Sequence, residues 1–381
     1  MKKQGAEEAG ESRIGFLPVL MFVLMVILAI AGLGIWDYER RAPYEAYYNE
    51  ALAEPFLTKD PMEDFPPSYR KALSSLQAFA PAWTFEPLWL QDSWDLVLYE
   101  ETKNEESNLV AYDDTEFYAP YKWMVKNDTV YDGANWFPAT REGVAYYMDP
   151  RNFLDIRTVF QFLTLDSGSQ ISSLEGVEDV FRDIPELLEF APTVYEAGKE
   201  ASYLAESLAI RMRQEISLTE GGISPLARGQ VLLEGDSTAY YNFYNIGAYP
   251  DPAVPNGAQV NGARFARGDV IEKTDPAYEA YHLPWNSPES AIKGGAVYIR
   301  NNYSTYGQDS LYLQKYDLLS GEYWHQYMQA LTAPEEEAIR LSRILLEAGG
   351  RQRPLVFKIP VFPDMPEDPM PWGGAKETEE N

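Results

Sequence analysis

The stretch Pro192–Glu215, with the sequence PTVYEAGKEASYLAESLAIRMRQE, decides the fold that we predict for this chain. Its apolar residues recur at the spacing of an α-helix and form one stripe along a single predicted helix: Val194, Ala197, Ala201, Leu204, Leu208 and Met212. Glu215 projects onto the middle of this stripe. Because burying a bare carboxylate is costly, Glu215 must be paired, be protonated or face a cleft.

Two interpretations of Glu215 follow from its position. A Glu at the end of a core helix that opens onto a cleft is the arrangement that lysozyme-like sugar hydrolases use for their general acid. Alternatively, Arg211 lies one helical turn earlier and is placed to pair with Glu215. The two interpretations are compatible, since a nearby cation lowers the pKa of a Glu and an apolar setting raises it.

The composition of the chain excludes several classes of function. Its 381 residues contain no Cys and carry a net charge of −28. The absence of Cys excludes a disulfide scaffold and thiolate chemistry, and the acidic charge argues against a nucleic-acid partner. The chain has only two His, His282 and His325, which disfavours a multi-His metal site. We therefore expect neither a metal nor an organic cofactor.

A hydrophobic segment near the N-terminus predicts a membrane anchor. Ile14–Ile35 contains no charged residue and is long enough to cross a bilayer as a helix. Basic residues precede it, so we expect the N-terminus on the inner side and the rest of this single-pass protein outside the cell membrane. We expect three segments here, a cytoplasmic tail over 1–13, a transmembrane helix over 14–36 and a stalk over 37–60. The alternative is a cleaved signal peptide with its small residues at Ala29 and Ala31.

The remaining chain is predicted to be α+β. A first region, 61–190, combines helix and strand patterns, including a helix over Ser68–Phe79 and a strand over Trp83–Pro87. A second region, 191–348, is mostly helical, and residues 349–381 form a strand followed by an acidic tail. The predicted helices of the second region are Thr193–Gln214, Pro288–Asn302 and Pro334–Ala348.

Local signals mark where several of these helices begin. Ser287 followed by Pro288 is an N-cap with a first-turn proline. Capping boxes are predicted at Ser172-x-x-Glu175 and at Thr332-x-x-Glu335. Between the first two helices of the second region lies a long Gly-, Pro- and Asn-rich segment, Gly221–Asn286, which we expect to be a binding loop or lobe.

Four sequence blocks follow one another in the second region: Tyr241–Tyr249 (YNFYNIGAY), Trp285–Ala296 (WNSPESAIKGGA), Gly307–Lys315 (GQDSLYLQK) and His325–Met328 (HQYM). Three more precede them, Phe65–Arg70 (FPPSYR), Trp83–Phe85 (WTF) and Ala145–Leu154 (AYYMDPRNFL). The four blocks resemble bacterial cell-wall N-acetylglucosaminidases of glycoside hydrolase family 73, and the upstream blocks resemble clostridial-type autolysins. The resemblance covers most of the chain beyond the stalk.

This resemblance implies hydrolysis of the β-1,4 bond between N-acetylglucosamine and N-acetylmuramic acid in peptidoglycan, with the glycan strands as the partner. It implies a mainly α, lysozyme-like catalytic domain over 191–348, preceded by a smaller mixed α/β accessory region over 61–190. It also implies one essential Glu at the end of a core helix, and Glu215 occupies that place. The relatives continue with Ser or Thr and Gly, whereas this chain reaches Glu220 and Gly221 after a short gap, so Glu220 is a rival acid.

The resemblance assigns further residues to the site. Tyr327 matches a Tyr that faces the catalytic Glu and orients the N-acetyl group or a water molecule; the alternative is a core Tyr. The predicted substrate-binding residues are Tyr241, Asn242, Phe243, Tyr244, Asn245 and Tyr249, of which some would serve only packing or turns. The second catalytic group stays open between the substrate's own acetamido group and a carboxylate from Glu220, Glu234, Asp236 or Asp251.

Two other functions remain compatible with the same sequence. The altered segment after Glu215 permits a catalytically inactive protein that binds peptidoglycan as a scaffold. A lysozyme-like fold also hosts muramidases and lytic transglycosylases. A membrane protein that regulates the activity is conceivable, but the sequence does not identify one.

Overall fold

A computed structural model describes residues 62–111, 123–125, 136–166, 171–216, 222–251 and 253–371. The predicted tail, anchor and stalk, and the rival acid Glu220, lie outside these residues. None of the helices within the described ranges has the length and apolar character needed to cross a membrane.

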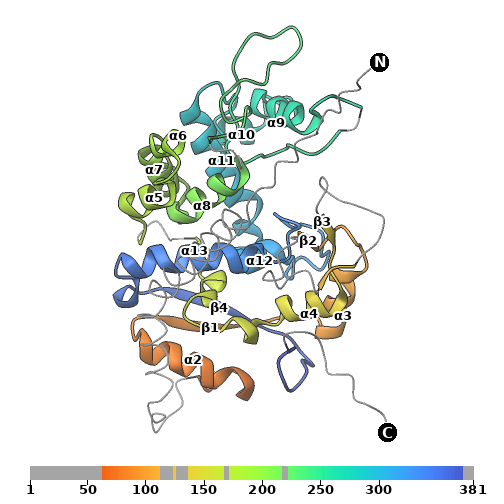
Figure 1. The fold of residues 1–381 in the computed structure, drawn as a ribbon, viewed down its shortest axis with the longest axis vertical. Helices are drawn as coiled ribbons and strands as arrows, with labels where there is room; N and C mark the ends of the chain where they lie inside the picture. The colour runs from red at the N-terminus through yellow and green to blue at the C-terminus, as the bar shows by residue number, and fades with distance from the viewer. Residues whose placement is uncertain are drawn as a thin grey trace, which may run out of the picture. The chain divides into compact units, whose positions relative to one another are not determined.

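The described chain contains helices of varied length and two small sheets (Figure 1). In the first half the elements are α2 (Pro67–Phe79), β1 (Thr84–Trp89), α3 (Trp94–Thr102), β2 (Leu109–Ala111), β3 (Trp136–Pro138), α4 (Arg141–Met148), η2 (Pro150–Phe153), η3 (Thr158–Phe162), α5 (Leu174–Phe181), α6 (Pro185–Leu188) and α7 (Ala191–Ala201). In the second half they are α8 (Ala205–Ile216), α9 (Gly257–Arg267), α10 (Pro276–Ala280), α11 (Pro288–Asn302), η5 (Ser304–Tyr306), α12 (Leu311–Lys315), α13 (Ala333–Glu347), η6 (Gly350–Gln352) and β4 (Val356–Val361).

The parallel pair β1 and β4 joins the beginning of the described chain to its end. Thr84 lies opposite Val356, and Trp89 lies opposite Val361. Helix α2 lies on one side of this pair and α13 on the other (Figure 1). Beside β1, the buried indole of Trp83 packs on nearby aromatic rings, with centroids at 5.4 Å from Phe160 and 4.9 Å from Phe357. The first predicted region and the strand beyond residue 349 therefore share one core.

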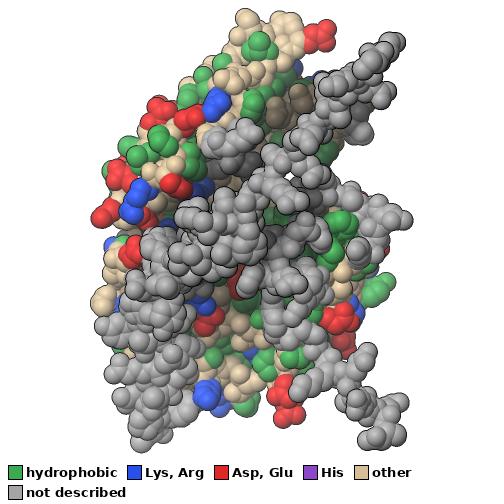
Figure 2. Space-filling model, viewed as in Figure 1, with side chains coloured by type: hydrophobic (Ala, Val, Ile, Leu, Met, Phe, Trp, Pro, Cys, Tyr) green, Lys and Arg blue, Asp and Glu red, His purple; other side chains and the backbone are tan. Residues whose placement is uncertain are grey.

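The helices above this sheet form the second part of the core. Helix α8 packs against α5, α7 and α13, and α11 packs against α7. The compact unit that contains all described residues begins at Pro55, so the boundary predicted between residues 190 and 191 runs through it. On the surface over α5 and α7, acidic and basic side chains are interspersed (Figure 2), and several form ion pairs: Asp179–Arg182, Asp183–Arg213 and Glu196–Lys199.

The single helix predicted over Thr193–Gln214 is wrong, because the chain breaks into α7 and α8 at Ser202. Ser202 has the left-handed conformation, with φ 52° and ψ 47°. The break is fixed by a neighbouring segment, since the backbone N–H of Leu204 donates to the carbonyl of Leu165 at 3.0 Å. It lets α7 fold back on α8 so tightly that a Cβ at Gly198 would lie 2.7 Å from that of Ala205. Every residue of the apolar stripe is nevertheless buried.

The predicted starts of three other helices were confirmed to different degrees. Helix α11 has the predicted bounds, and Ser287 caps it in a capping box with Ser290. Helix α5 begins one residue later than predicted, with Ser173 as its N-cap. Thr332 is the N-cap of α13 but makes no side-chain cap bond, because its hydroxyl donates to Glu336 instead. The predicted binding segment 221–286 contains two helices, α9 and α10.

Candidate active site

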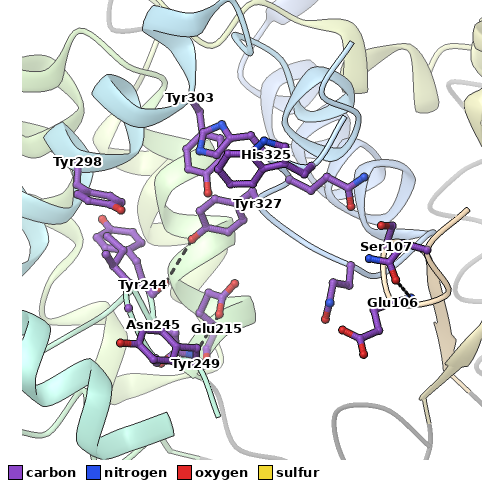
Figure 3. Close-up of a pocket in the computed structure, with 17 residues that line it drawn as sticks. Glu106, Ser107, Glu215, Tyr244, Asn245, Tyr249, Tyr298, Tyr303, His325 and Tyr327 are labelled. Atoms are coloured by element: carbon purple, nitrogen blue, oxygen red, sulfur yellow. Dashed lines mark hydrogen bonds between the residues drawn. The ribbon is translucent and has the colours of Figure 1, made fainter. Parts of the chain in front are cut away.

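A cavity of about 760 Å³ opens where α8 ends (Figure 3). Glu215, in the last turn of α8, forms part of its wall. The loop 244–249 and Tyr298 and Tyr303, at the end of α11, form the same side, while residues from 104–107 and 324–329 complete the wall. Within α8, Glu215 continues the face that carries the buried Leu208 and Met212, so its helix directs it inward.

Asn245 holds Glu215 at the cavity wall. Its Nδ2 donates to the backbone carbonyl of Glu215 at 2.7 Å and to the carboxylate Oε2 at 3.1 Å. Asn245 has a φ of 50°, a left-handed conformation that Asn adopts more readily than most residues. The YNFYNIGAY block therefore supplies a residue that fixes both the backbone and the carboxylate of Glu215.

Arg211 pairs with α13 and α12, which corrects the predicted pairing with Glu215. Its Nη1 donates to Oε1 of Gln314 at 2.7 Å, and its Nη2 lies 3.6 Å from Oε2 of the buried Glu337. Burial lowers the pKa of Arg211, but the charges of Glu337 and other acidic neighbours, Glu215 among them, raise that pKa above its ordinary value. Arg211 is thus a permanent cation behind the site that acts on Glu215 through its field.

Tyr327 lies on the cavity wall between Arg211 and the loop 244–249. The guanidinium of Arg211 lies 3.7 Å from the centre of the Tyr327 ring, and the hydroxyl donates to the carbonyl of Tyr244 at 3.4 Å. Burial and the Glu215 charge raise the pKa of the Tyr327 hydroxyl well above its ordinary value. The hydroxyl therefore stays protonated at neutral pH, next to Glu215.

An aromatic stack supports Tyr327 from above (Figure 3). The ring of His325 stacks on Tyr303 with centroids 4.7 Å apart, and Tyr303 meets Tyr327 edge to face at 5.2 Å. Nδ1 of His325 forms a 2.8 Å hydrogen bond with Oε1 of Gln308. This bond gives His325 a structural role, but His325 and Tyr303 also line the cavity.

The predicted substrate-binding residues divide into two groups. Tyr244, Asn245 and Tyr249 line the cavity, and Tyr249 is 62% exposed. The other members, Tyr241, Asn242 and Phe243, are not part of the described lining.

Asn242 and Phe243 have packing contacts, which is the alternative that the sequence left open for some members of this group. Asn242 is completely buried, and its side chain holds the turn by donating to the carbonyl of Ile246 at 2.8 Å. Phe243 is also completely buried and packs on the ring of Phe190. Tyr241 is half-buried, and its ring lies against Gly229.

The carboxylates proposed as a second catalytic group are placed elsewhere where the structure describes them. Glu234 is exposed, Asp236 accepts a 2.9 Å hydrogen bond from the hydroxyl of Tyr240, and Asp251 accepts a 2.9 Å bond from the N–H of Ala253. None of these three is among the described residues of the cavity wall. A different carboxylate is: Glu106, from the region predicted to be accessory.

The wall that contains Glu106 was missed by sequence reasoning. It consists of Asn104, Glu106 and Ser107, together with the segment 324–329. Residues 104–107 connect α3 to β2 and carry no pattern of their own, so nothing in the local sequence indicates that they face Glu215. In the described ranges, no cluster of three or more His, Cys, Asp or Glu is arranged to hold a metal ion.

The chain is similar to curated proteins named as a glucosaminidase and as autolysins. It is 32% identical over 196 residues to the beta-N-acetylglucosaminidase of Bacillus subtilis (strain 168), a match of 50% of this chain and 19% of that protein. It is 25% identical over 252 residues to a bifunctional autolysin of Staphylococcus epidermidis, a match of 64% of this chain and 16% of that protein. The chain thus spans less than a fifth of the length of the curated relatives it matches. These relatives confirm the resemblance to glucosaminidases and autolysins, although no family model matches the chain.

Among solved structures, the chain is similar to S. aureus glucosaminidase B, with a TM-score of 0.49 and 23% identity over 74% of this chain and 94% of that one. It is also similar to a catalytic mutant of S. aureus autolysin E in complex with the disaccharide NAG-NAM, with a TM-score of 0.45 and 18% identity over 68% of this chain and 93% of that one.

Proposed function

We propose that this chain is a peptidoglycan hydrolase that cleaves the β-1,4 bond between N-acetylglucosamine and N-acetylmuramic acid, with Glu215 as the general acid. The observation that carries the proposal is the placement of Glu215 on a cavity wall at the end of a core helix, held there by Asn245. The names of the two relatives, a beta-N-acetylglucosaminidase and a bifunctional autolysin, support the same activity.

In the proposed reaction, Glu215 gives its proton to the glycosidic oxygen as that oxygen leaves the anomeric carbon. Asn245 keeps the carboxyl group aimed at the cavity, because it donates both to the carboxylate and to the carbonyl of the same residue. The protonated hydroxyl of Tyr327 is available to orient the N-acetyl group of the substrate or a water molecule. The group that attacks the anomeric carbon is either the acetamido oxygen of the substrate itself or a water molecule.

We also propose that residues 14–36 anchor the chain in the cell membrane with the hydrolase outside, facing the wall. The support is the uncharged run Ile14–Ile35 and the basic residues before it. This position would place the site next to newly exported glycan strands.

The test is digestion of purified cell wall by the full-length protein in detergent, followed by analysis of the new chain ends. We expect reducing-end N-acetylglucosamine from the native chain and at least a hundredfold less from Glu215→Gln, since the amide has no proton to give. The matched control is Glu178→Gln, because Glu178 is an exposed residue of α5 that does not line the cavity.

The chain end that appears decides between the alternatives. A reducing-end muramic acid would show a muramidase, and an anhydro-muramic end would show a lytic transglycosylase. Binding of glycan strands without any new end, unchanged by Glu215→Gln, would show an inactive scaffold. Each of these outcomes would overturn the proposed bond specificity.

A further inference from the structure

The wall opposite Glu215 is held in place by hydrogen bonds to two buried residues, Glu101 and Lys315. Glu101, at the end of α3, and Lys315, at the end of α12, are both almost completely buried. Burial raises the pKa of Glu101 to about 7 and lowers the pKa of Lys315 to about 8, and the charge of each residue opposes the shift of the other. Nζ of Lys315 donates to the backbone carbonyl of Ser107 at 2.9 Å. A buried ammonium therefore fixes the backbone of a residue that lines the cavity.

Amide side chains and backbone bonds extend this connection. Gln326, itself on the cavity wall, donates to Oε2 of Glu101 at 2.8 Å, and Asn108 donates to the same oxygen at 3.0 Å. The N–H of Leu109 donates to the carbonyl of Gln329 at 2.8 Å. Because the segment 104–107 is tied to 324–329 at this end, its side chains meet a ligand from a defined position rather than from a free loop.

This wall presents a carboxylate to the cavity. The side chain of Glu106 is exposed, and its backbone N–H donates to Oδ1 of Asn104 at 3.2 Å, which closes a turn. No described Lys or Arg forms an ion pair with Glu106. Figure 3 shows Glu106 and Ser107 on one side of the cavity, with Glu215 and Asn245 on the other.

No described Lys or Arg side chain lines the cavity, because Arg211 and Lys315 are buried behind its wall. The described lining residues include two carboxylates, Glu106 and Glu215, and no Lys or Arg. A cleft lined by one sign of charge attracts ligands of the opposite sign and repels those of its own. Peptidoglycan strands differ in this respect, since removal of the stem peptide leaves a lactyl carboxylate, whereas a peptide amine or a glucosamine without its acetyl group is a cation.

We propose that Glu106 makes the cleft selective for glycan strands that carry a protonated amine, and against strands that carry a free lactyl carboxylate. This proposal rests on the proposed hydrolase function and names a substrate preference within it. An amine of the stem peptide and the amine of a de-N-acetylated sugar have the same chemistry, and the experiment separates them.

The experiment compares full-length native protein and Glu106→Gln on three glycan preparations. The first carries stem peptides with a free amine, the second is peptide-free and partly de-N-acetylated, and the third is peptide-free and fully N-acetylated. We expect Glu106→Gln to lower kcat/KM about two- to fivefold on an amine-bearing preparation, mainly through KM, as for an exposed ion pair. We expect kcat/KM on the third preparation to stay equal or rise. These effects should shrink at high salt.

The first two preparations identify the source of the amine. If Glu106→Gln raises KM on only one of them, the amine of that preparation is the one that Glu106 contacts. A loss by the same factor on all three preparations, or no change on any, would overturn the proposal. Glu178→Gln is again the control and should change none of them.

Binding measurements separate this proposal from the proposed function. Equilibrium binding of the three preparations to Glu215→Gln and to Glu215→Gln combined with Glu106→Gln requires no turnover. If the native chain cleaves no glycan, the hydrolase proposal fails, while the charge preference is still decided by these affinities. If cleavage occurs and the affinities do not depend on Glu106, only the preference fails.

Discussion

Replacement of Arg211 by Met tests how much this buried cation contributes to the free energy of unfolding. Arg211 contacts three elements at once: Gln314 of α12, Glu337 of α13 and the ring of Tyr327. Burial raises the pKa of Glu337 even with Arg211 beside it. Without Arg211, Glu337 would remain buried with no cation in direct contact, so it would take up a proton on folding.

The size of this effect follows from the pH. A carboxyl with an ordinary pKa of 4.5 costs about 1.4 kcal/mol per pH unit to keep protonated above that value, which is about 3.4 kcal/mol at pH 7 and about 0.7 kcal/mol at pH 5. Loss of the hydrogen bond to Gln314 and of the contact with the Tyr327 ring adds about 2 kcal/mol at either pH. We therefore expect Arg211→Met to lower the free energy of unfolding by about 5 kcal/mol at pH 7 and by about 3 kcal/mol at pH 5.

The sign of the pH dependence is fixed by the direction of the pKa shift. In the variant, the folded chain binds a proton that the unfolded chain releases above pH 4.5, so stability is lost as the pH rises from there. The assay is urea unfolding followed by tryptophan fluorescence at both pH values. A second variant, Arg211→Met combined with Glu337→Leu, removes the carboxyl and should recover at least about 2 kcal/mol at pH 7. A cost below about 1 kcal/mol, a cost equal at both pH values, or no recovery in the double variant would refute this reasoning.

Two further predictions concern the site and its surroundings. Glycine at position 245 tolerates the left-handed backbone, so Asn245→Gly removes only the two hydrogen bonds to Glu215. Because a hydrogen bond to a charged group contributes about 1.5–3 kcal/mol, kcat should fall about tenfold or more. An unchanged kcat in the chain-end assay would show that Glu215 does not depend on Asn245. Burial, with the nearby Asp155 and Glu336 charges, raises the pKa of Glu335 to about 7, so the native chain loses stability as the pH rises from about 4.5 to 7. Glu335→Gln should remove that loss and raise the unfolding free energy at pH 8 by about 1–3 kcal/mol, and a variant less stable than the native chain at pH 8 would contradict the shift.

Elements whose signals lie within a few residues were predicted well. Pro288–Asn302 has its cap, its first-turn proline and its apolar spacing within its own sequence, and α11 has those bounds. The strand over Trp83–Pro87 was also recognisable from its alternating residues, and a strand was expected beyond residue 349, but nothing in the sequence indicated that the two pair with each other in parallel.

The break at Ser202 shows why periodicity alone was insufficient. The apolar spacing from Val194 to Met212 fits one helix, yet the same residues are all buried on two helices that fold back on each other. The backbone bond from Leu204 to Leu165 and the close contact at Gly198 stabilise that turn. Both depend on residues that a helical pattern does not include.

The residues of the candidate site also differ in whether the sequence alone indicated them. The apolar stripe indicated Glu215, and the sequence blocks indicated Tyr327 and part of the loop 241–249, because these blocks can be compared with known enzymes. They did not distinguish Asn245, which contacts Glu215, from Asn242, which holds a turn, because the two amides have similar sequence surroundings and different burial.

By itself, the sequence determined most of the local elements, the resemblance to glucosaminidases and autolysins, and the choice of Glu215 as the candidate acid. Only the tertiary structure decided which groups share a cavity with Glu215. Arg211 pairs with Glu337, and Glu106 lines the same cavity although it is distant from Glu215 along the chain. The physical reason is the distance along the chain over which each kind of interaction acts. A cap or an apolar stripe acts over one or two helical turns, whereas a cavity wall is set by hydrogen bonds and buried charges between segments that are distant along the chain.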